Sequence, residues 1–297
     1  MPRARLCDLP TPVREVPALG AWVKDDSHSA PLWGGNKPRK LEWILADAEQ
    51  RGKRSILTFG GLGTNHGLAT ALYARERGMA CVLALVDQPR DAHVEAQLER
   101  IGASGARVYI TRSVPRTAFA FPWIYLRTGR PYVLPTGGSS PVGALGFVEA
   151  AFELADQVDA GELPAPAAIV MALGSGGTAA GLAAGLPLAG LANTRVVAVL
   201  VNDKIKLTHA TITKLARRSQ KLIGQDGAPL APLEVVTGFM GAGYGHATPE
   251  AGAAIEEAAA AGLELDPVYT GKAMAALRAG SAGDGPVLFW NTQSAQE

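Results

Sequence analysis

The chain has 297 residues, of which 47% are hydrophobic, and its formal net charge is +1. This length suffices for one large domain or two modest domains with a real core, and the near-neutral charge gives no indication of a nucleic acid or a charged membrane as a partner. No apolar run is long enough to cross a membrane, the N-terminal residues do not resemble a signal peptide, and two cysteines are too few for a disulfide framework, so we expect a cytoplasmic protein.

Short apolar runs rich in Val, Ile and Leu alternate along the chain with longer segments of helical character. We predict strands over residues 55–59, 80–86, 106–110, 132–134, 168–173, 195–201, 233–236 and 287–290. We predict helices over residues 38–51, 66–77, 93–101, 143–157, 178–186, 207–222, 250–261 and 271–278. Most strands are apolar throughout, as expected when helices cover both faces of a sheet. The alternation predicts an open, mostly parallel α/β architecture, with a linker near residues 158–166.

The segment 34–40, which reads Gly-Gly-Asn-Lys-Pro-Arg-Lys, places a lysine directly before a proline. Pro38 suits the first position of a helix and disfavours the helical conformation for the residue before it, so we expect Lys37 to be extended at a fixed helix entrance. A lysine held near other cations or in a dry pocket can lose its proton and attack a carbonyl, as a Schiff-base cofactor such as pyridoxal phosphate requires. Taken alone, the segment could also be a basic helix start at the surface.

A glycine-rich loop at residues 174–178 follows an apolar strand and opens a helix. Glycines let the backbone approach an anion closely, and the helix N-terminus supplies free amides, so we predict a phosphate site. Gly174, Gly176 and Ala179 also fit the dinucleotide pattern, and Asp203 stands where a ribose-binding acid would. An NAD(P)-dependent oxidoreductase is therefore an alternative for this loop.

A second loop, residues 60–67, also joins a strand to a helix. Thr64 or Asn65 would cap that helix, and the capped end offers amides and hydroxyls to an anion such as a substrate carboxylate. His66 either contacts the ligand or is simply exposed. Two anion sites and a positioned lysine fit an amino acid bound to a phosphorylated aldehyde better than they fit a dinucleotide.

Two tyrosines lie in turn-rich segments. Tyr269 ends the sequence Asp-Pro-Val-Tyr before a predicted helix, and Tyr244 stands between two glycines. Either ring could stack on a flat cofactor or move protons, or could only fill the core. The five histidines are scattered without the spacing of metal ligands, so we expect no metal site.

Together these blocks resemble the fold-type II pyridoxal-phosphate-dependent enzymes, in the branch of D-cysteine desulfhydrase and 1-aminocyclopropane-1-carboxylate (ACC) deaminase. The resemblance covers nearly the whole chain, including Thr-Pro at 11–12, the block 34–42, Asn-His at 65–66, Gly-Gly-Ser at 137–139, Leu-Gly-Phe-Val at 145–148, the glycine loop and Asp-Pro-Val-Tyr at 266–269. It implies two open, mostly parallel twisted sheets flanked by helices, as in the tryptophan synthase β subunit, with the cofactor in the cleft between domains. It also implies a larger cofactor-binding domain of residues 1–40 and 150–297 and a smaller α/β domain of residues 41–149.

The same resemblance implies roles for individual residues. Lys37 would hold pyridoxal phosphate as a Schiff base, Asn65 would lie beside its phenolic oxygen, and Thr64 would lie next to the substrate carboxylate and the reacting carbons. Tyr244 and Tyr269 would be active-site tyrosines. The phosphate would be bound by Lys40, Gly174, Ser175, Gly176, Gly177 and Thr178, and the substrate would be approached by His66 and Ser139.

Two positions bear on the choice within the branch. ACC deaminases carry Glu after Asp-Pro-Val-Tyr and Leu in the terminal strand, where this chain has Thr270 and Thr292. A hydroxyl near the pyridine nitrogen of the cofactor leaves that nitrogen largely unprotonated. The cofactor ring is then a weaker electron sink, which disfavours opening a cyclopropane. The resemblance thus implies a homodimeric lyase that eliminates a β-substituent from a small amino acid, with D-cysteine, converted to pyruvate, ammonia and hydrogen sulfide, as the leading candidate.

The C-terminal strand departs from the family pattern. The chain reads Asn-Thr-Gln-Ser at 291–294, where members usually carry His-Thr-Gly-Gly and a further segment. ACC deamination, β-replacement, racemisation, or cofactor binding with little catalysis are therefore alternatives to the elimination.

Overall fold

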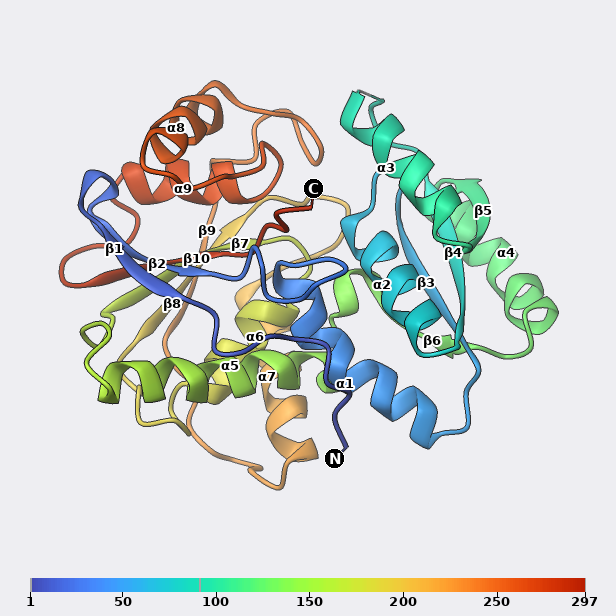
Figure 1. The fold of residues 1–297 in the computed structure, drawn as a ribbon, viewed down its shortest axis with the longest axis horizontal. Coiled ribbons are helices and arrows are strands. Elements are labelled where there is room, and N and C mark those ends of the chain that lie inside the picture. The colour runs from blue at the N-terminus through green and yellow to red at the C-terminus, as the bar shows by residue number, and fades with distance from the viewer. Residues whose placement is uncertain (1, 91, 297) are drawn as a thin grey trace.

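The computed structural model describes residues 2–90 and 92–296 and contains two β-sheets that lie side by side (Figure 1). The larger sheet has the strand order β1-β2-β10-β7-β8-β9, and all its neighbouring strands are parallel except the pair β1 and β2. These strands are β1 (Val13–Val16), β2 (Ala21–Asp25), β7 (Ala168–Leu173), β8 (Arg195–Leu200), β9 (Leu233–Val236) and β10 (Val287–Asn291).

The smaller sheet is entirely parallel and has the order β5-β4-β3-β6. Its strands are β3 (Ser55–Gly61), β4 (Ala80–Val86), β5 (Arg107–Arg112) and β6 (Tyr132–Val133). The predicted α/β architecture with two mostly parallel sheets is therefore confirmed.

Helices cover both faces of the larger sheet. Every residue of β7 and β10 is buried, as expected for central strands between two helical layers. One face packs against α5 (Pro141–Asp159), α6 (Gly177–Gly185) and α7 (His209–Leu222), and the other packs against α8 (Pro249–Ala260) and α9 (Thr270–Arg278).

The smaller sheet is covered in the same way. One face packs against α1 (Asn36–Gln50), α2 (Asn65–Glu76) and α3 (Ala92–Ala103), and the other packs against α4 (Val114–Arg127). Short 3-10 turns occupy Pro17–Leu19 and Thr136–Gly138. None of the described helices is long and apolar enough to cross a membrane.

Three elements were absent from the sequence prediction. Strands β1 and β2 are short and carry charged residues, and α4 contains Pro122, which removes one backbone donor from its interior. The predicted linker is also shorter than expected, because α5 continues to Asp159. The domain boundary predicted between residues 149 and 150 falls inside this uninterrupted helix, so the domain limits stay a prediction.

Candidate active site

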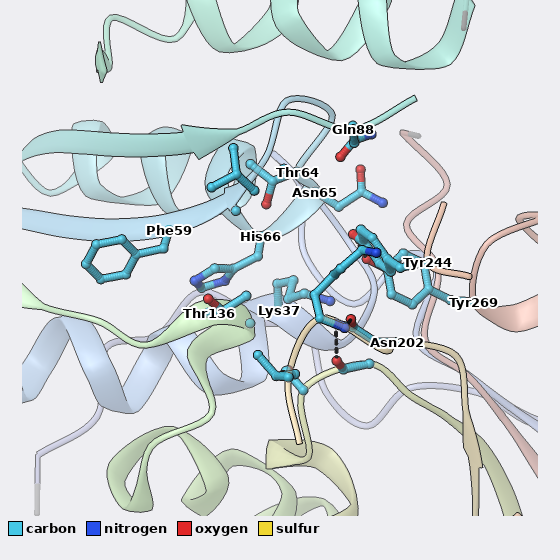
Figure 2. A pocket seen from close by; sticks show the side chains of 18 of the residues that line it. Lys37, Phe59, Thr64, Asn65, His66, Gln88, Thr136, Asn202, Tyr244 and Tyr269 are labelled. Carbon is cyan, nitrogen blue, oxygen red and sulfur yellow. Dashed lines mark hydrogen bonds between the residues drawn. The ribbon is translucent and has the colours of Figure 1, made fainter. Parts of the chain in front are cut away.

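A cavity of about 760 Å³ opens between the two sheets, at the carboxyl ends of β3, β4, β7 and β8 (Figure 2). Ligands of open α/β sheets bind at this edge, and the volume lies within the range of small-molecule sites. Twelve of the fifteen residues predicted for the site line this cavity: Lys37, Lys40, Thr64, Asn65, His66, Gly174, Ser175, Gly176, Thr178, Tyr244, Tyr269 and Thr292.

Three predicted residues do not line the cavity and instead support its wall: Ser139, Gly177 and Thr270. The Ser139 hydroxyl donates to Ser175 Oγ at 2.8 Å and accepts from the amide of Gly177 at 2.9 Å, so it braces the glycine loop from behind. Thr270 is fully buried, and its hydroxyl donates to Asp266 Oδ2 at 2.7 Å. Of the two threonines expected near the pyridine nitrogen, only Thr292 reaches the cavity.

Lys37 lies inside the first turn of α1, and the expectation of an extended lysine with Pro38 at the first helical position is wrong. The helix begins at Asn36, and its N-cap is Gly35, whose φ of 72° favours glycine. Pro38 is tolerated two residues further on, because the amides of the first turn have no intrahelical acceptor. The Gly35 amide donates to the Asp26 carbonyl at 2.7 Å and that of Asn36 to the Thr292 carbonyl at 3.2 Å, which determines where α1 starts.

The Lys37 amine is oriented by its neighbour. It donates to Asn36 Oδ1, and Asn36 Nδ2 donates in turn to Thr178 Oγ1 at 3.2 Å. These two hydrogen bonds connect the start of α1 to the start of α6. The lysine is thereby held next to the loop predicted to bind phosphate.

Two buried basic groups lie close to Lys37. Burial, together with the Lys37 charge, lowers the pKa of Lys40 well below its usual value. Burial also lowers the pKa of His66, with the charges of Lys37 and Lys40 adding to the effect, so His66 stays neutral. Lys37 itself is half-buried and lines the cavity between these two groups and the start of α6.

The tautomer of His66 follows from its hydrogen bonds. The Thr58 hydroxyl donates to the Leu134 carbonyl at 3.0 Å, so it must accept from His66 Nε2, which lies 3.0 Å away. Nδ1 is then the unprotonated nitrogen, and it has no hydrogen-bond partner among the described residues. The cavity wall thus contains a buried acceptor without a protein donor.

The glycine loop has the form of an anion site. Helix α6 starts after its N-cap Gly176, which has a φ of 90° and no side chain to cap the helix, while Ser139 Oγ accepts from the amide of Gly177. A Cβ atom at Gly174 would lie 2.9 Å from Cε1 of Tyr269, so only glycine allows the ring this close. Asn202 Nδ2 donates to the Gly174 carbonyl at 2.8 Å and so fixes the loop from the side of β8.

The second predicted anion site lies at the start of α2. The sequence predicted Thr64 or Asn65 as the N-cap of this helix, and the N-cap is Thr64. Its Oγ1 accepts from the Gly67 amide at 3.1 Å. Cβ atoms at Gly60 or Gly67 would lie within 2.5 Å of the Thr64 side chain, so both glycines are needed for its position. The Gln97 side-chain amide donates to Asn65 Oδ1. This hydrogen bond fixes the orientation of the Asn65 amide, whose nitrogen is the donor.

The two tyrosines meet across the cavity wall. Tyr244 Oη lies 2.5 Å from Tyr269 Oη, and the rings pack edge to face with centroids 5.9 Å apart. Asp266 accepts from the amide of Tyr269 at 2.6 Å, and Asp203 accepts from the amide of Tyr244 at 3.2 Å. Asp203, considered as a ribose-binding acid, thus holds the loop that carries Tyr244.

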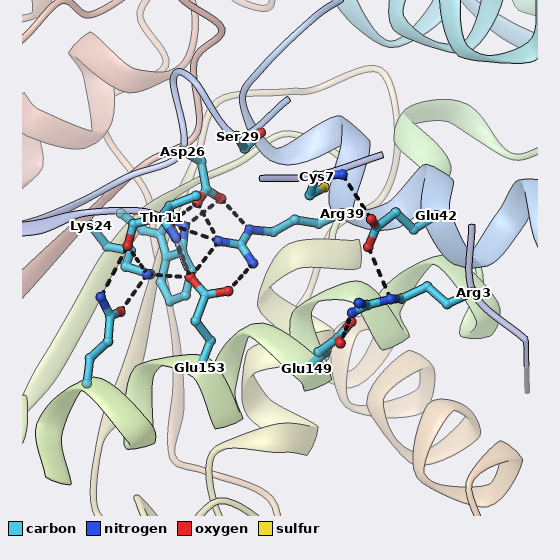
Figure 3. Close-up of polar contacts among 12 residues, drawn as sticks. Arg3, Cys7, Thr11, Lys24, Asp26, Ser29, Arg39, Glu42, Glu149 and Glu153 are labelled. Carbon is cyan, nitrogen blue, oxygen red and sulfur yellow. Dashed lines mark hydrogen bonds and ion pairs between the residues drawn. The ribbon is translucent and has the colours of Figure 1, made fainter. Parts of the chain in front are cut away.

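Behind Lys37, a buried ionic network fixes α1 to the larger sheet (Figure 3). Arg39 is 1% exposed and forms ion pairs of 2.8 Å with both Asp26 and Glu153. Glu153 also pairs with the buried Lys24 at 2.5 Å, and Trp290 Nε1 donates to Asp26 at 2.9 Å. Because Arg39 follows Lys37 by two residues, the network limits the movement of the helix turn that carries the lysine.

Several lining residues were missed by the sequence analysis. Gln88 and Asn202 follow the carboxyl ends of β4 and β8, and the edge rule for α/β sheets would have found them. Phe59 and Phe121 form an aromatic part of the wall. No motif indicated Phe121, since its helix was not predicted.

These residues fit the cofactor that the sequence resemblance implies. Apart from the Gly177 amide, which donates to Ser139, the start of α6 can offer its backbone amides to a phosphate. Gly174 leaves room for Tyr269 against the loop, and Lys37 lies next to both. Lys37 would hold the aldehyde carbon, Asn65 the phenolic oxygen, and the first turn of α6 the phosphate.

Comparisons with known proteins agree with this geometry. The family model described as "Pyridoxal-phosphate dependent enzyme" matches residues 5–293. A D-cysteine desulfhydrase of Serratia proteamaculans is 35% identical over 99% of this chain and 94% of the relative, and one of Salmonella schwarzengrund is 34% identical with the same coverage. A solved structure of an ACC deaminase homologue has a TM-score of 0.83 and 30% identity, covering 99% of this chain and 92% of that chain. An aspartate racemase at 16% identity and a TM-score of 0.66 shares the fold.

Proposed function

The chain belongs to the pyridoxal-phosphate-dependent enzymes, and we propose that within this family of lyases and related enzymes it eliminates the β-substituent of D-cysteine. The reaction is D-cysteine plus water to pyruvate, ammonia and hydrogen sulfide. The observation that carries the proposal is the convergence of Lys37, the start of α2 and the start of α6 on one cavity. It is supported by the D-cysteine desulfhydrases, which align with nearly the whole chain.

The chain supplies two anion sites and one base. When bound, pyridoxal phosphate supplies an aldehyde that condenses with amines and a ring that accepts the electron pair left at Cα. The first turn of α6 binds the phosphate, and Thr64, Asn65 and the amides at the start of α2 bind the substrate carboxylate. In this arrangement the substrate Cα would lie between the two sites, on the side of Lys37.

Lys37 acts as the general base and removes the proton from Cα. Its amine lines the cavity beside the buried Lys40 and His66, where it can reach a bound substrate. The Tyr244–Tyr269 pair moves a proton at the leaving group side, since its two hydroxyls share one hydrogen bond at the cavity wall. Arg39 and its partners hold the helix turn of Lys37 during both transfers.

The test is a product assay on purified protein supplied with pyridoxal phosphate. D-cysteine is expected to yield hydrogen sulfide and pyruvate in equal amounts, and L-cysteine and D-serine serve as comparison substrates. A protein that binds the cofactor yet releases neither product from D-cysteine would contradict the proposal.

ACC deamination is the second candidate function, because the structural neighbour with a TM-score of 0.83 is described as an ACC deaminase homologue. The position after the tyrosine is Thr270, where ACC deaminases carry Glu, and the Thr270 hydroxyl donates to Asp266 Oδ2. ACC as substrate would release 2-oxobutanoate and ammonia without hydrogen sulfide. The identity of the keto acid therefore separates the two reactions.

We also propose that the enzyme works in the cytoplasm as a homodimer. The thiols of Cys7 and Cys81 are both free, which suits a reducing compartment. The exposed apolar side chains of Phe119, Trp123 and Leu126 on α4 favour contact with another protein surface. Light scattering coupled to gel filtration tests the dimer, and fractionation of the source cells tests the location.

A further inference from the structure

Lys272 is a buried lysine that does not line the cavity. It lies in the first turn of α9 and is 0% exposed, although lysine is rarely buried completely unless it is paired. No carboxylate of the described residues forms an ion pair with it, and its ammonium group donates to the Met240 carbonyl at 2.8 Å. The contact that accompanies its burial is therefore one with the backbone of a loop.

That loop, residues 237–248, joins β9 to α8 and carries Tyr244. Four of its residues are glycines with a φ between 67° and 134°: Gly238, Gly241, Gly243 and Gly245. Because glycine has many backbone conformations within reach, contacts with other elements decide which path such a loop takes. Two of these contacts are the hydrogen bond from Lys272 to the Met240 carbonyl and the one from the Tyr244 amide to Asp203.

Lys272 also belongs to the helix that begins at the other tyrosine of the pair. Tyr269 is the N-cap of α9, and Lys272 lies in the first turn of that helix. The hydrogen bond from Lys272 to Met240 therefore connects the helix that starts at Tyr269 to the loop that carries Tyr244. The position of the two tyrosine hydroxyls relative to each other depends on this connection.

The charges around Lys272 support the same role. Burial lowers the pKa of Lys272, whereas the charges of Asp266 and Asp203 raise it. Asp266 accepts from the amide of Tyr269, and Asp203 accepts from the amide of Tyr244. The ammonium group therefore interacts with both carboxylates that hold the tyrosines.

We propose that Lys272 is a positioning residue for the proton transfer by the Tyr244–Tyr269 pair, and that it acts through the loop of Tyr244. The inference rests on the proposed lyase function and extends it to a residue that does not reach the cavity. The hydrogen bond to the Met240 carbonyl holds the loop so that the Tyr244 hydroxyl stays in contact with that of Tyr269. Without this hydrogen bond the loop takes other paths, and the pair loses the short contact that a proton transfer requires.

The first test does not depend on turnover. The protein is labelled with 3-fluorotyrosine, and the fluorine resonance of Tyr244 is identified by its absence from the spectrum of Tyr244→Phe. In Lys272→Met this resonance is expected to move by more than its line width, because the hydroxyl loses its fixed partner. The resonance of Tyr73, whose hydroxyl binds the backbone of Trp33, is expected to stay in place. An unmoved Tyr244 resonance would overturn the proposal.

Lys24→Met is the matched control, because Lys24 is also 0% exposed but donates to Thr11, Glu153 and Gln157 instead. It is expected to lower stability and to leave the Tyr244 resonance in place. Equal shifts in the two variants would show that the loss of any buried lysine moves the resonance, and would overturn the proposal. If Lys272→Met does not fold, Lys272→Gln, which is shorter and uncharged, is measured instead, with the same expected shift.

A kinetic cycle on the holoenzyme tests whether the effect passes through the Tyr244 hydroxyl. Lys272→Met is expected to lower kcat for D-cysteine by about tenfold, within the range of acid–base effects. In the Tyr244→Phe background the same substitution should change kcat by less than about twofold, because the hydroxyl that Lys272 positions is absent. A full tenfold loss in that background is the result of a merely structural role and would overturn the proposal.

The two measurements separate this inference from the lyase function. If D-cysteine releases no pyruvate but Lys272→Met moves the Tyr244 resonance, the lyase function fails and the role of Lys272 in placing Tyr244 stands. If D-cysteine is turned over and the resonance does not move, the lyase function stands and the role of Lys272 fails.

Discussion

Tyr244 and Tyr269 share one hydrogen bond of 2.5 Å between their hydroxyl oxygens, although they come from two separate loops. Each loop is held by its own carboxylate, Asp203 for the first and Asp266 for the second. Gly174 allows the Tyr269 ring to lie against the glycine loop, residues 174–178, which we propose binds the phosphate. The pair is thus positioned from both sides, and each hydroxyl orients the other.

The first prediction concerns this pair. Tyr244→Phe and Tyr269→Phe remove one hydroxyl each, and each is expected to lower kcat for D-cysteine by about 10² or more, in the range of positioned acid–base groups. The double variant should fall little further than the weaker single variant, because either change already removes the shared hydrogen bond. Strict additivity of the two effects in a double-mutant cycle would show that the hydroxyls act separately.

The second prediction concerns Lys37. Lys37→Ala should abolish both turnover and the borohydride-sensitive visible absorbance of the bound cofactor, because Lys37 is the amine held next to the phosphate loop. Lys214→Ala on the exposed face of α7 is the control and should keep both properties. Absorbance that persists in Lys37→Ala after borohydride treatment would assign the covalent link to another lysine.

The third prediction concerns the phosphate loop. Gly176→Ala places a Cβ on a residue with φ of 90° at the start of α6 and is expected to weaken cofactor binding. Gly190→Ala is matched, because Gly190 has a φ of 86° and open space around it. Both variants should lose about 1–2 kcal/mol of stability from backbone strain. Only Gly176→Ala should raise the dissociation constant of pyridoxal phosphate in a titration of the apoprotein, and equal constants would contradict the assignment.

The strands most accurately predicted from sequence were β4, β7 and β9, whose observed bounds match the predicted ranges. β4 and β7 form continuous apolar runs because helices cover both faces, so local composition identifies them, whereas β9 is an edge strand that contains Glu234. β2 was missed because it contains the charged Lys24. The burial of that lysine is compensated by acceptors distant in sequence, namely the Thr11 carbonyl and the side chains of Glu153 and Gln157 on α5.

In the candidate site, too, features set by local sequence were predicted and features set by distant contacts were missed. Residues in sequence motifs, such as Lys37 and Thr64, were predicted, because turn chemistry and helix caps are local. The start of α1 was misplaced, since it depends on hydrogen bonds from Gly35 and Asn36 to Asp26 and Thr292. Phe121 was missed because Pro122 obscured the pattern of α4.

The last prediction concerns the acid stability of the network behind Lys37. Burial raises the pKa of Glu153, but the hydrogen bonds and charges of Arg39 and Lys24 outweigh it and bring the pKa from 4.5 to about 2. Below pH 4.5 the unfolded chain therefore binds a proton that the folded chain does not. The stabilisation by Glu153 is complete above pH 4.5 and is lost as the pH falls toward 2.

Glu153→Gln removes this titration and leaves Arg39 and Lys24 with one carboxylate fewer. The free energy of unfolding at pH 7 should fall by about 3–5 kcal/mol, as for other broken buried pairs. Its decrease between pH 4.5 and 2 should be smaller than in the unmodified protein. Glu49→Gln, which breaks the exposed pair with Arg77, is the control and should cost less than about 1 kcal/mol. Urea unfolding across this pH range measures both quantities, and parallel curves for Glu153→Gln and the unmodified protein would show that Glu153 does not titrate as described.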